Sequence, residues 1–167
     1  MKELMPWMLS SGLFEAGNVL EIYTDGGCTG NPGPGGWAAV IIAPDHEPCE
    51  ISGGETSTTN NRMELTAVIN ALDMVSRKFP RRRFIRMISD SQYVQRGFNE
   101  WMGKWIARGW KTAAGKPVKN RDLWMKLERT GRELRIDWRW IRGHAGNMWN
   151  ERCDELVARE RAVFGNP

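Results

Sequence analysis

Long apolar runs are missing from this 167-residue sequence, and cysteine is scarce. No stretch of about 18 apolar residues occurs, which is the length that a membrane-spanning helix requires. The three cysteines, Cys28, Cys49 and Cys153, are odd in number, lie far apart and lack the CxxC pairing of zinc or redox sites. We therefore exclude a membrane-spanning chain and a cysteine-based metal or redox site, and expect a reducing, cytoplasmic location.

A secretory signal is also missing from the first residues. Charged residues and Pro6 interrupt their short apolar patch, and no small-residue cleavage site follows it. We expect residues 1–18 to be a loosely ordered N-terminal extension, as chain ends commonly are. Residues 19–163 have the size of one ordinary domain, and the composition of 41% hydrophobic and 26% charged residues is typical of a globular protein.

Positive charge is concentrated in one part of the chain. Residues 96–121 hold seven basic residues and one acidic residue, Glu100, for a local charge of +6. The whole chain carries a net charge of +4, so the residues outside this segment carry −2. A basic arm on a slightly acidic body suits a polyanion that is held in one place while an acidic site acts on it, and nucleic acid is the obvious polyanion. A solvated helical face is the plainer alternative, and it stays open at this point.

Three strands are expected near the start of the domain. Residues 19–24 alternate apolar and polar side chains and stop at Asp25, which two glycines follow. Residues 37–43 form a continuous apolar run and residues 49–52 a shorter one. The connections are short, so these strands should pair antiparallel, with Asp25 at the end of the first.

Helices and two further strands should follow. Apolar residues repeat at helical spacing from Met63 to Val75, after a Thr-Thr-Asn-Asn segment at 58–61 that supplies N-cap chemistry. Residues 84–88 predict a fourth strand that ends at Asp90. The remaining expected elements are a helical segment 91–110 broken by Gly97, Gly103 and Gly109, a helix capped by Asn120, a strand 136–141, and a last helix of about 149–160. This order predicts an α/β fold with a mixed sheet and helices packed against it, rather than a doubly wound parallel sheet.

Four acidic residues stand where metal ligands can converge. Hard divalent cations take oxygen ligands, and a site for two of them needs several carboxylates from different elements. Asp25 and Asp90 lie at strand ends, and Glu64 and Asp154 lie early in two helices. Each also has a structural interpretation: Asp25 as a turn residue, Glu64 as the acid of a capping box, Asp90 as an N-cap, and Asp154 as a favourable charge on a helix dipole. Residue by residue, the two interpretations are about evenly balanced.

Several long motifs in a fixed order shift that balance. They are TDGGCTGNPGPGG at 24–36, TTNNRMEL at 58–65, SDSQYV at 89–94, GHAG at 143–146 and NERCDEL at 150–156. Together they resemble bacterial type 1 ribonuclease H, over about residues 20–159. Trp105 and the segments 108–112 and 116–120 are similar to the basic helical protrusion of that family. The resemblance implies a ribonuclease H-like fold, with a five-stranded mixed sheet.

The resemblance also implies an activity. The family hydrolyses the RNA strand of RNA/DNA hybrids, leaving 5′-phosphate and 3′-hydroxyl ends, with Asp25, Glu64, Asp90 and Asp154 as ligands of Mg2+ or Mn2+. Two ions, about 3.5–4 Å apart, would activate the attacking water and stabilise the leaving oxygen. His144, in a glycine-flanked loop, would shuttle a proton near the leaving group or aid product release.

Contacts with the hybrid follow from the same resemblance. The amides of Asn31, Asn60 and Gln92 would sense 2′-hydroxyls across the minor groove, and Thr59 would hold a phosphate of the DNA strand. Asn150, four residues before Asp154, would support the site, or else cap its helix. In the protrusion the implied contacts are Trp105, Trp110 and Lys111, although packing is favoured over base stacking for Trp101 and Trp105.

Two other functions stay open at this stage. The fold and its carboxylates would also suit another nuclease or nucleotidyl transferase, and a non-catalytic hybrid-binding module would need only the basic arm. The segment Asn147-Met148-Trp149 departs from the family pattern, which leaves the exact position of the histidine open. No feature demands more than a monomer.

Overall fold

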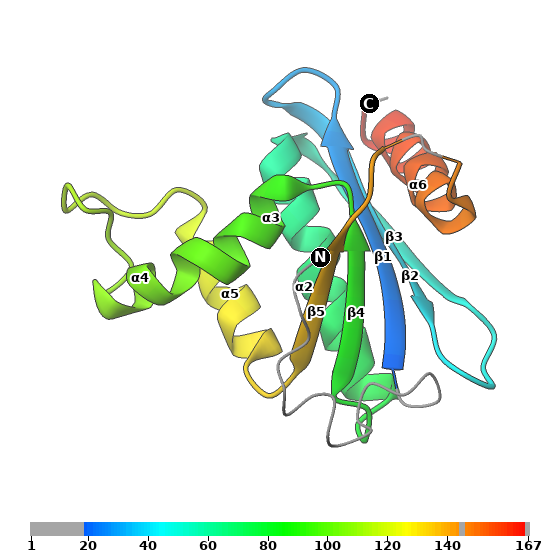
Figure 1. Ribbon diagram of the computed structural model, residues 1–167. Helices are drawn as coiled ribbons and strands as arrows, with labels where there is room; N and C mark the ends of the chain where they lie inside the picture. Colours follow the sequence, from blue (N-terminus) through cyan, green and yellow to red (C-terminus); the bar gives the residue numbers. More distant parts are fainter. Residues whose placement is uncertain (1–18, 144–145, 166–167) are drawn as a thin grey trace.

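A five-stranded mixed sheet organises the chain in the computed structural model, which describes residues 19–143 and 146–165 (Figure 1). The strands lie in the order β3-β2-β1-β4-β5. They are β1 Val19–Cys28, β2 Gly33–Ile42, β3 Cys49–Thr58, β4 Phe84–Ser89 and β5 Arg135–Trp140. β1, β2 and β3 pair antiparallel, whereas β4 pairs parallel with β1 and with β5. The expected mixed sheet, with three antiparallel strands first, is confirmed.

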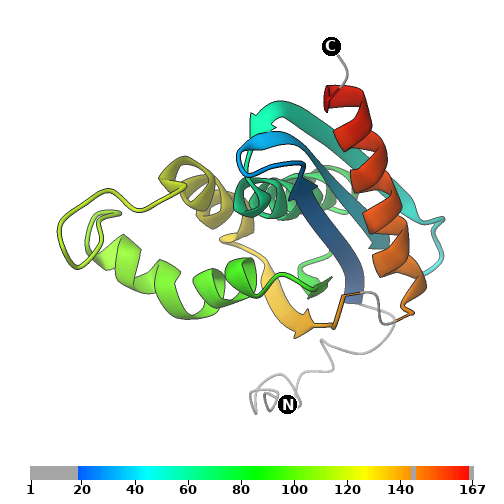
Figure 2. The same cartoon turned by 90° about the horizontal axis from the view of Figure 1, so that it is seen from above.

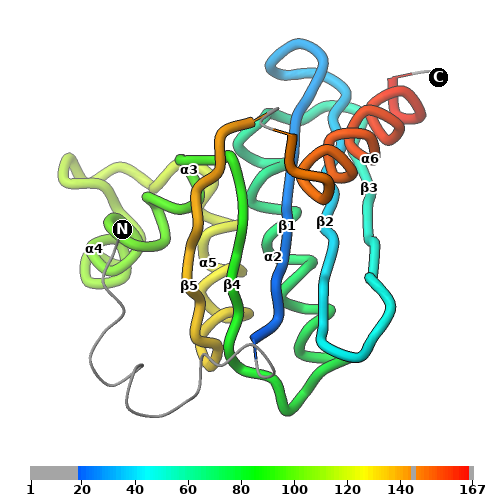
Figure 3. Tube along the Cα trace, turned by 45° about the vertical axis from the view of Figure 1, so that its right-hand side comes forward, coloured from blue at the N-terminus to red at the C-terminus, as the bar shows by residue number. Residues whose placement is uncertain are grey.

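Helices cover both faces of this sheet. They are α2 Asn60–Lys78, α3 Gln92–Arg96, α4 Met102–Ala107, α5 Arg121–Gly131 and α6 Met148–Gly165, with a π-helical turn Gly97–Trp101 between α3 and α4. α2 packs on one face together with α5, and α6 packs across β1, β2 and β3 on the other (Figures 2 and 3). Among the helices of the described residues, none combines the length and the apolar content of a membrane span.

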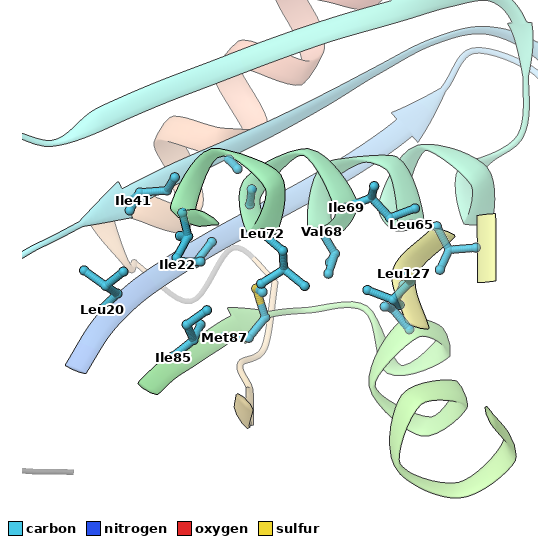
Figure 4. Packing of buried hydrophobic residues seen from close by; sticks show 14 of the residues in the cluster. Leu20, Ile22, Ile41, Leu65, Val68, Ile69, Leu72, Ile85, Met87 and Leu127 are labelled. Carbon is cyan, nitrogen blue, oxygen red and sulfur yellow. The ribbon is translucent and has the colours of Figure 1, made fainter. Parts of the chain in front are cut away.

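The two cores follow from the alternation of side chains along the strands. Leu20 and Ile22 of β1 point toward α2 and meet Leu72 there (Figure 4). Tyr23 and Val40 belong to the smaller cluster under α6. Successive strand residues face opposite sides, so a single strand serves both cores. Full burial of each Leu or Ile contributes about 1.5–3 kcal/mol to the stability of the fold.

A close backbone contact fixes α2 on β1. A Cβ atom added to Gly26 would lie 2.4 Å from the carbonyl carbon of Met63 and 2.5 Å from the backbone nitrogen of Glu64. Only a residue without a side chain fits there. This contact brings the first turns of α2, including Glu64, directly onto the strand that carries Asp25.

α3, the π-helical turn, α4 and the loop 108–120 form the expected protrusion, which extends away from the sheet (Figure 1). The expected breaks at glycine are only partly right. Gly97 starts the π-helical turn, and a Cβ there would lie 2.1 Å from Cη2 of Trp124, so this glycine serves close packing. Gly103 lies inside α4 without interrupting it, whereas Gly109, at φ +63°, follows the end of that helix.

Candidate active site

The four expected carboxylates come from β1, α2, the segment just after β4, and α6. The parallel ladder between β1 and β4 ends at the pair Tyr23–Ile88, and Asp25 and Asp90 each stand two residues beyond it. Both aspartates therefore lie at the same edge of the sheet, Asp25 within β1 and Asp90 just after β4. The prediction that Asp25 ends its strand is wrong, since β1 continues to Cys28 through pairing with β2. The two glycines after Asp25 therefore belong to the strand and form no turn.

Asp25 lies in the electric field of the other three acids. Burial raises the pKa of Asp25 to about 7, and the negative charge of Asp90 is the next largest cause. A hydrogen bond that the Gly26 backbone N–H donates to Oδ1, at 2.9 Å, opposes the rise. The charges of Asp154 and Glu64 add smaller increases. The four carboxylates therefore interact electrostatically, although they come from four separate parts of the chain.

Glu64 is held by Ser91. The Ser91 hydroxyl donates a short hydrogen bond to Oε2 of Glu64. Burial raises the pKa of Glu64 to about 7; the Ser91 hydrogen bond opposes this rise, and the charge of Asp90 adds to it. The same Ser91 oxygen accepts a hydrogen bond from the Val94 backbone nitrogen at 3.4 Å, so it also caps α3.

The helix caps overturn two of the structural interpretations of the acids. Thr59 caps α2, and its hydroxyl oxygen accepts a hydrogen bond from the Arg62 backbone nitrogen at 3.3 Å. Glu64 is thus too far into the helix to be the acid of a capping box. Ser91, not Asp90, caps α3. Neither Glu64 nor Asp90 has the capping role that its sequence position suggested.

Asp154 and Asn150 lie on α6. Asp154 is exposed and is the seventh residue of the helix, beyond the first turn to which the helix dipole mainly extends. Asn150 is buried inside the helix, and its backbone nitrogen donates to Oδ1 of Asn147 at 2.9 Å. The cap interpretation of Asn150 is therefore wrong, because Asn147 provides the cap. This role also explains part of the unusual Asn147-Met148-Trp149 segment. His144 lies outside the described residues.

The carboxylates form an open cluster. Within residues 19–143 and 146–165, no three Asp, Glu, His or Cys side chains already surround a single point as a closed set of metal ligands. Asp25 and Glu64 nevertheless have pKa values raised by their acidic neighbours as well as by burial. Carboxylate oxygens are the ligands that Mg2+ and Mn2+ prefer, and a cation would relieve this repulsion. The donor chemistry of the cluster fits a hard divalent cation.

Three of the expected substrate contacts come together beside this cluster. Asn60 accepts a hydrogen bond from the Cys28 backbone nitrogen at 2.8 Å through its Oδ1, and its own backbone nitrogen donates to Oδ1 of Asn31 at 3.2 Å. Thr59 precedes Asn60 as the helix cap. These contacts tie the loop after β1 to the start of α2. Gln92 is exposed at the start of α3.

Aromatic packing builds the protrusion. The ring centroids of Trp101 and Trp105 lie 5.8 Å apart, and those of Trp105 and Trp124 5.2 Å apart. The packing interpretation of Trp101 and Trp105 is confirmed by these contacts. Trp110 is half-buried against the same core, and its backbone nitrogen donates to the Trp105 carbonyl oxygen at 2.6 Å. Lys111 is exposed.

Asn120 begins α5, but not as the side-chain cap that the sequence predicted. It adopts φ +59° and makes no side-chain capping hydrogen bond. Its amide instead donates to the Tyr93 hydroxyl at 3.1 Å, and its Oδ1 accepts from Arg62 at 3.4 Å. Arg62 also forms a bidentate ion pair with Asp122, at 2.8 and 3.0 Å. The start of α2 is thereby joined to the base of the protrusion.

Sequence reasoning gave no role to three residues of the site. Ser91 was visible in the SDSQYV motif, yet nothing in the motif indicates that its hydroxyl holds Glu64. A Cβ atom added to Gly143 would lie 2.8 Å from Oδ2 of Asp90. The indole nitrogen of Trp140 donates to the Asp90 carbonyl oxygen at 3.1 Å. Both contacts join segments about 50 residues apart, which strand periodicity alone does not reveal.

Comparison with known proteins places the chain in a family. The family model described as RNase H matches residues 17–162. A ribonuclease H of Aromatoleum aromaticum is 55% identical over 140 residues, which cover 84% of this chain and 88% of that protein. A ribonuclease H of Saccharopolyspora erythraea is 50% identical over 147 residues, which cover 87% of this chain and 92% of the relative.

Solved structures agree with this assignment. LC9-RNase H1, a type 1 RNase H with the type 2 active-site motif, superposes with a TM-score of 0.76 at 31% identity, covering 87% of this chain and 73% of that one. LC11-RNase H1, solved in complex with an RNA/DNA hybrid, gives a TM-score of 0.66 at 26% identity, covering 86% and 97%. The chain belongs to the RNase H family and is therefore a nuclease that hydrolyses phosphodiester bonds.

Proposed function

We propose that this chain is an endoribonuclease that hydrolyses the RNA strand of RNA/DNA hybrids with two divalent metal ions, leaving 5′-phosphate and 3′-hydroxyl ends. The observation that carries the proposal is the pKa of Asp25, which burial raises most and which the charges of Asp90, Asp154 and Glu64 raise further. Such a cluster is costly in a folded protein unless a cation offsets it. The relatives are ribonucleases H, and one structural relative was solved with an RNA/DNA hybrid.

Asp25, Glu64, Asp90 and Asp154 are the residues that would hold Mg2+ or Mn2+. When bound, these ions increase the acidity of the attacking water and stabilise negative charge on the leaving 3′-oxygen. The chain's own contribution is to position the carboxylates. The Gly26 N–H fixes one oxygen of Asp25, and the Ser91 hydroxyl fixes one oxygen of Glu64, so both side chains are oriented in advance.

His144 would supply the proton for the leaving 3′-oxygen. A histidine side chain can give up a proton and regain one from water in each turnover. The residue before it, Gly143, lies against the Asp90 carboxylate.

Recognition of the hybrid would be shared between two surfaces. Asn31 and Asn60, joined by a hydrogen bond beside the carboxylates, would read 2′-hydroxyl groups of the RNA strand together with Gln92, and Asn150 would support the site from α6. Thr59 would hold a phosphate of the DNA strand. The protrusion would add sequence-independent phosphate contacts through Lys111, beside Trp105 and Trp110. One catalytic domain, residues 19–163, acting as a monomer would suffice for these contacts.

A non-catalytic hybrid-binding module is the alternative from a different class. Such a module would need the protrusion but would gain nothing from four clustered carboxylates. Two of these, Asp25 and Glu64, have pKa values near 7, and strongly perturbed acids of this kind concentrate at catalytic sites. The raised pKa values therefore favour the enzyme over the module.

Cleavage of end-labelled oligonucleotides tests the proposal directly. The substrates are an RNA/DNA hybrid, duplex RNA, duplex DNA and single-stranded RNA, each incubated with Mg2+, with Mn2+ or with chelator. We expect cutting of the RNA strand of the hybrid alone, only with metal, and products that a phosphatase can dephosphorylate at the 5′ end. A hybrid that is bound but never cut with either metal would establish the binding module instead.

A further inference from the structure

Trp140, the last residue of β5, is exposed at the catalytic edge of the sheet. Its side chain is 48% exposed, although it is one of the largest apolar groups of the chain. The indole N–H donates a hydrogen bond to the Asp90 carbonyl oxygen at 3.1 Å, which holds the ring in a fixed position. A single exposed aromatic residue needs no explanation by itself. Trp140 differs because its neighbours form a site around it.

These neighbours line a hollow of about 230 Å³ together with Trp140. They are Gln92, Gln95 and Arg96, all from α3. Two amides, a guanidinium group and an indole face combine hydrogen-bond donors and acceptors, a positive charge and an apolar wall. This is the chemistry that contacts the sugars and phosphates of nucleic acids. The hollow is smaller than the usual pocket for a small-molecule ligand, so it has room for part of one nucleotide.

The location of the hollow strengthens this interpretation. α3 begins just after Asp90 and leads through the π-helical turn to α4, so it connects the carboxylates with the protrusion (Figure 1). A nucleic acid that reaches both places must pass over α3. Gln92 and Arg96 are exposed on that helix. The hollow therefore lies on the route between the place of cleavage and the basic arm.

Arg96 is available for a phosphate at small cost. Its partner is Glu100, at 3.4 Å, and the two side chains are 57% and 55% exposed. Exposed ion pairs of this kind contribute about 0–1 kcal/mol, so exchange of the carboxylate for a phosphate meets little resistance. The Arg96 guanidinium also lies over the Trp101 ring, 5.5 Å from its centroid, which keeps it on the protrusion side of the hollow.

We propose that Trp140, Gln92, Gln95 and Arg96 form a subsite for one sugar–phosphate unit of the substrate, between the carboxylate cluster and the protrusion. The indole face packs on the sugar, the two amides hydrogen-bond its hydroxyl or ring oxygen, and the guanidinium pairs with the phosphate. The subsite rests on the proposed function, because it deepens the recognition of the same hybrid.

Steady-state kinetics of Trp140→Ala, Trp140→Phe and Arg96→Gln test the subsite. The substrates are one long hybrid and a series shortened one base pair at a time from either end. We expect Trp140→Ala to raise KM about tenfold, the order of the loss of one aromatic contact to a nucleotide, and to change KM more than kcat. Its KM should also stop responding to the removal of the base pair that fills the hollow, whereas the wild-type KM rises at that step.

The Trp140→Phe variant distinguishes a contact between Trp140 and the substrate from a structural role of Trp140 in holding Asp90. Phenylalanine keeps an apolar ring but cannot donate the hydrogen bond to Asp90, so we expect its KM to stay near the wild-type value. If Trp140→Ala and Trp140→Phe both lower kcat equally and leave KM unchanged, Trp140 only holds Asp90 and the subsite is refuted. Arg96→Gln should raise KM and reduce the salt dependence of binding by about one ion. An unchanged salt slope also counts against the subsite.

A surface variant serves as the control, and a binding assay separates failure of the subsite from failure of the proposed function. Val163→Ala removes a side chain that is 61% exposed on α6, and it should leave KM unchanged. Affinity for a fluorescent hybrid is measured in chelator for every variant. If the wild-type protein binds the hybrid without cutting it, the proposed function fails while the subsite is still judged. Equal affinity of Trp140→Ala and the wild-type protein would then overturn the subsite alone.

Discussion

Gly143 lies against the carboxylate of Asp90, so closely that a Cβ atom at Gly143 would be 2.8 Å from Oδ2. Gly143, the residue before His144 in the sequence, is therefore in contact with a proposed metal ligand. We expect Gly143→Ala to displace Asp90 and lower kcat by about a hundredfold, since misplacement of a catalytic group by about 1 Å has an effect of that order. Gly103→Ala is the matched control, because nothing lies within 4 Å of its added Cβ. Equal activity of both variants would show that Asp90 tolerates the contact.

The carboxylates should be needed for cleavage and not for binding. We expect Asp25→Asn and Asp90→Asn to abolish metal-dependent cleavage, because an amide is a poorer ligand for a hard cation than a carboxylate. Affinity for the hybrid, measured in chelator, should stay near the wild-type value. Asp73→Asn is the control, since Asp73 is an exposed residue paired with Arg77 at 2.9 Å. Turnover retained by Asp25→Asn would refute the site.

Stability without metal should fall as the pH rises. The pKa of Asp25 is raised from 3.8 to about 7, so the folded state binds this proton more tightly than the unfolded chain does. Its stabilising effect is complete below about pH 4 and is lost as the pH rises through about 7. At pH 8 in chelator, Asp25→Asn should therefore be more stable than the wild-type protein, by about 1–2 kcal/mol after allowance for solvent screening, or roughly 2–8 °C in Tm.

Thermal unfolding at pH 4 and pH 8 checks this expectation. The difference in Tm between Asp25→Asn and the wild-type protein should be largest at pH 8 and small at pH 4. Added Mg2+ should raise the Tm of the wild-type protein at pH 8 more than that of the variant, because ligand binding to the folded state stabilises it. A wild-type Tm that is higher at pH 8 than that of Asp25→Asn in chelator would contradict the charge cluster.

The protrusion should act through phosphate contacts. Neutralising Lys111 and Lys116 together should weaken hybrid binding, without a change in sequence preference, and reduce the slope of log affinity against log salt by about two. Lys78→Ala provides the comparison, because Lys78 ends α2 beside Phe79, away from the protrusion. Fluorescence anisotropy at several salt concentrations measures the slope. The same slope in the double variant and the wild-type protein would exclude the protrusion from binding.

His144 should assist catalysis without being essential. We expect His144→Ala to lower kcat by about 10²–10⁴-fold, the usual contribution of a general acid or base, with some turnover remaining. A loss as complete as that of the aspartate variants would mean that the histidine does more than transfer a proton.

The architecture was accessible from sequence because its signals are local. Alternating apolar residues predicted the strands, helical spacing predicted α2, and the ordered motifs placed the acids. The run of β1 past Asp25 was missed for a physical reason. Gly26 and Gly27 have the composition of a turn. Gly26, however, lies where the backbone of α2 approaches β1 too closely for a Cβ atom, whereas a Cβ atom at Gly27 would meet only ordinary contacts, the nearest at 3.7 Å. Composition alone does not distinguish these two uses of glycine.

The contacts that support the site could not be predicted from the sequence. Asn147 and Asn150 are equally good cap residues by type, and only the observed start of α6 assigns the cap to Asn147. The hydrogen bond between Ser91 and Glu64 joins residues 27 positions apart. The position of Trp140 above Asp90 depends on the parallel pairing of β4 and β5. These contacts arise from tertiary structure, and the periodicity of apolar residues in the sequence does not predict them.

Gly26 limits which substitutions this protein can tolerate next to its proposed active site. Gly26 has no functional side chain. Any side chain at this position would push α2 away from β1 and increase the distance between Glu64 and Asp25. In a saturation mutagenesis library selected for activity, Gly26 should tolerate replacement as poorly as the aspartates do. Positions without a catalytic group can thus limit the substitutions that this protein tolerates as strictly as the acids themselves do.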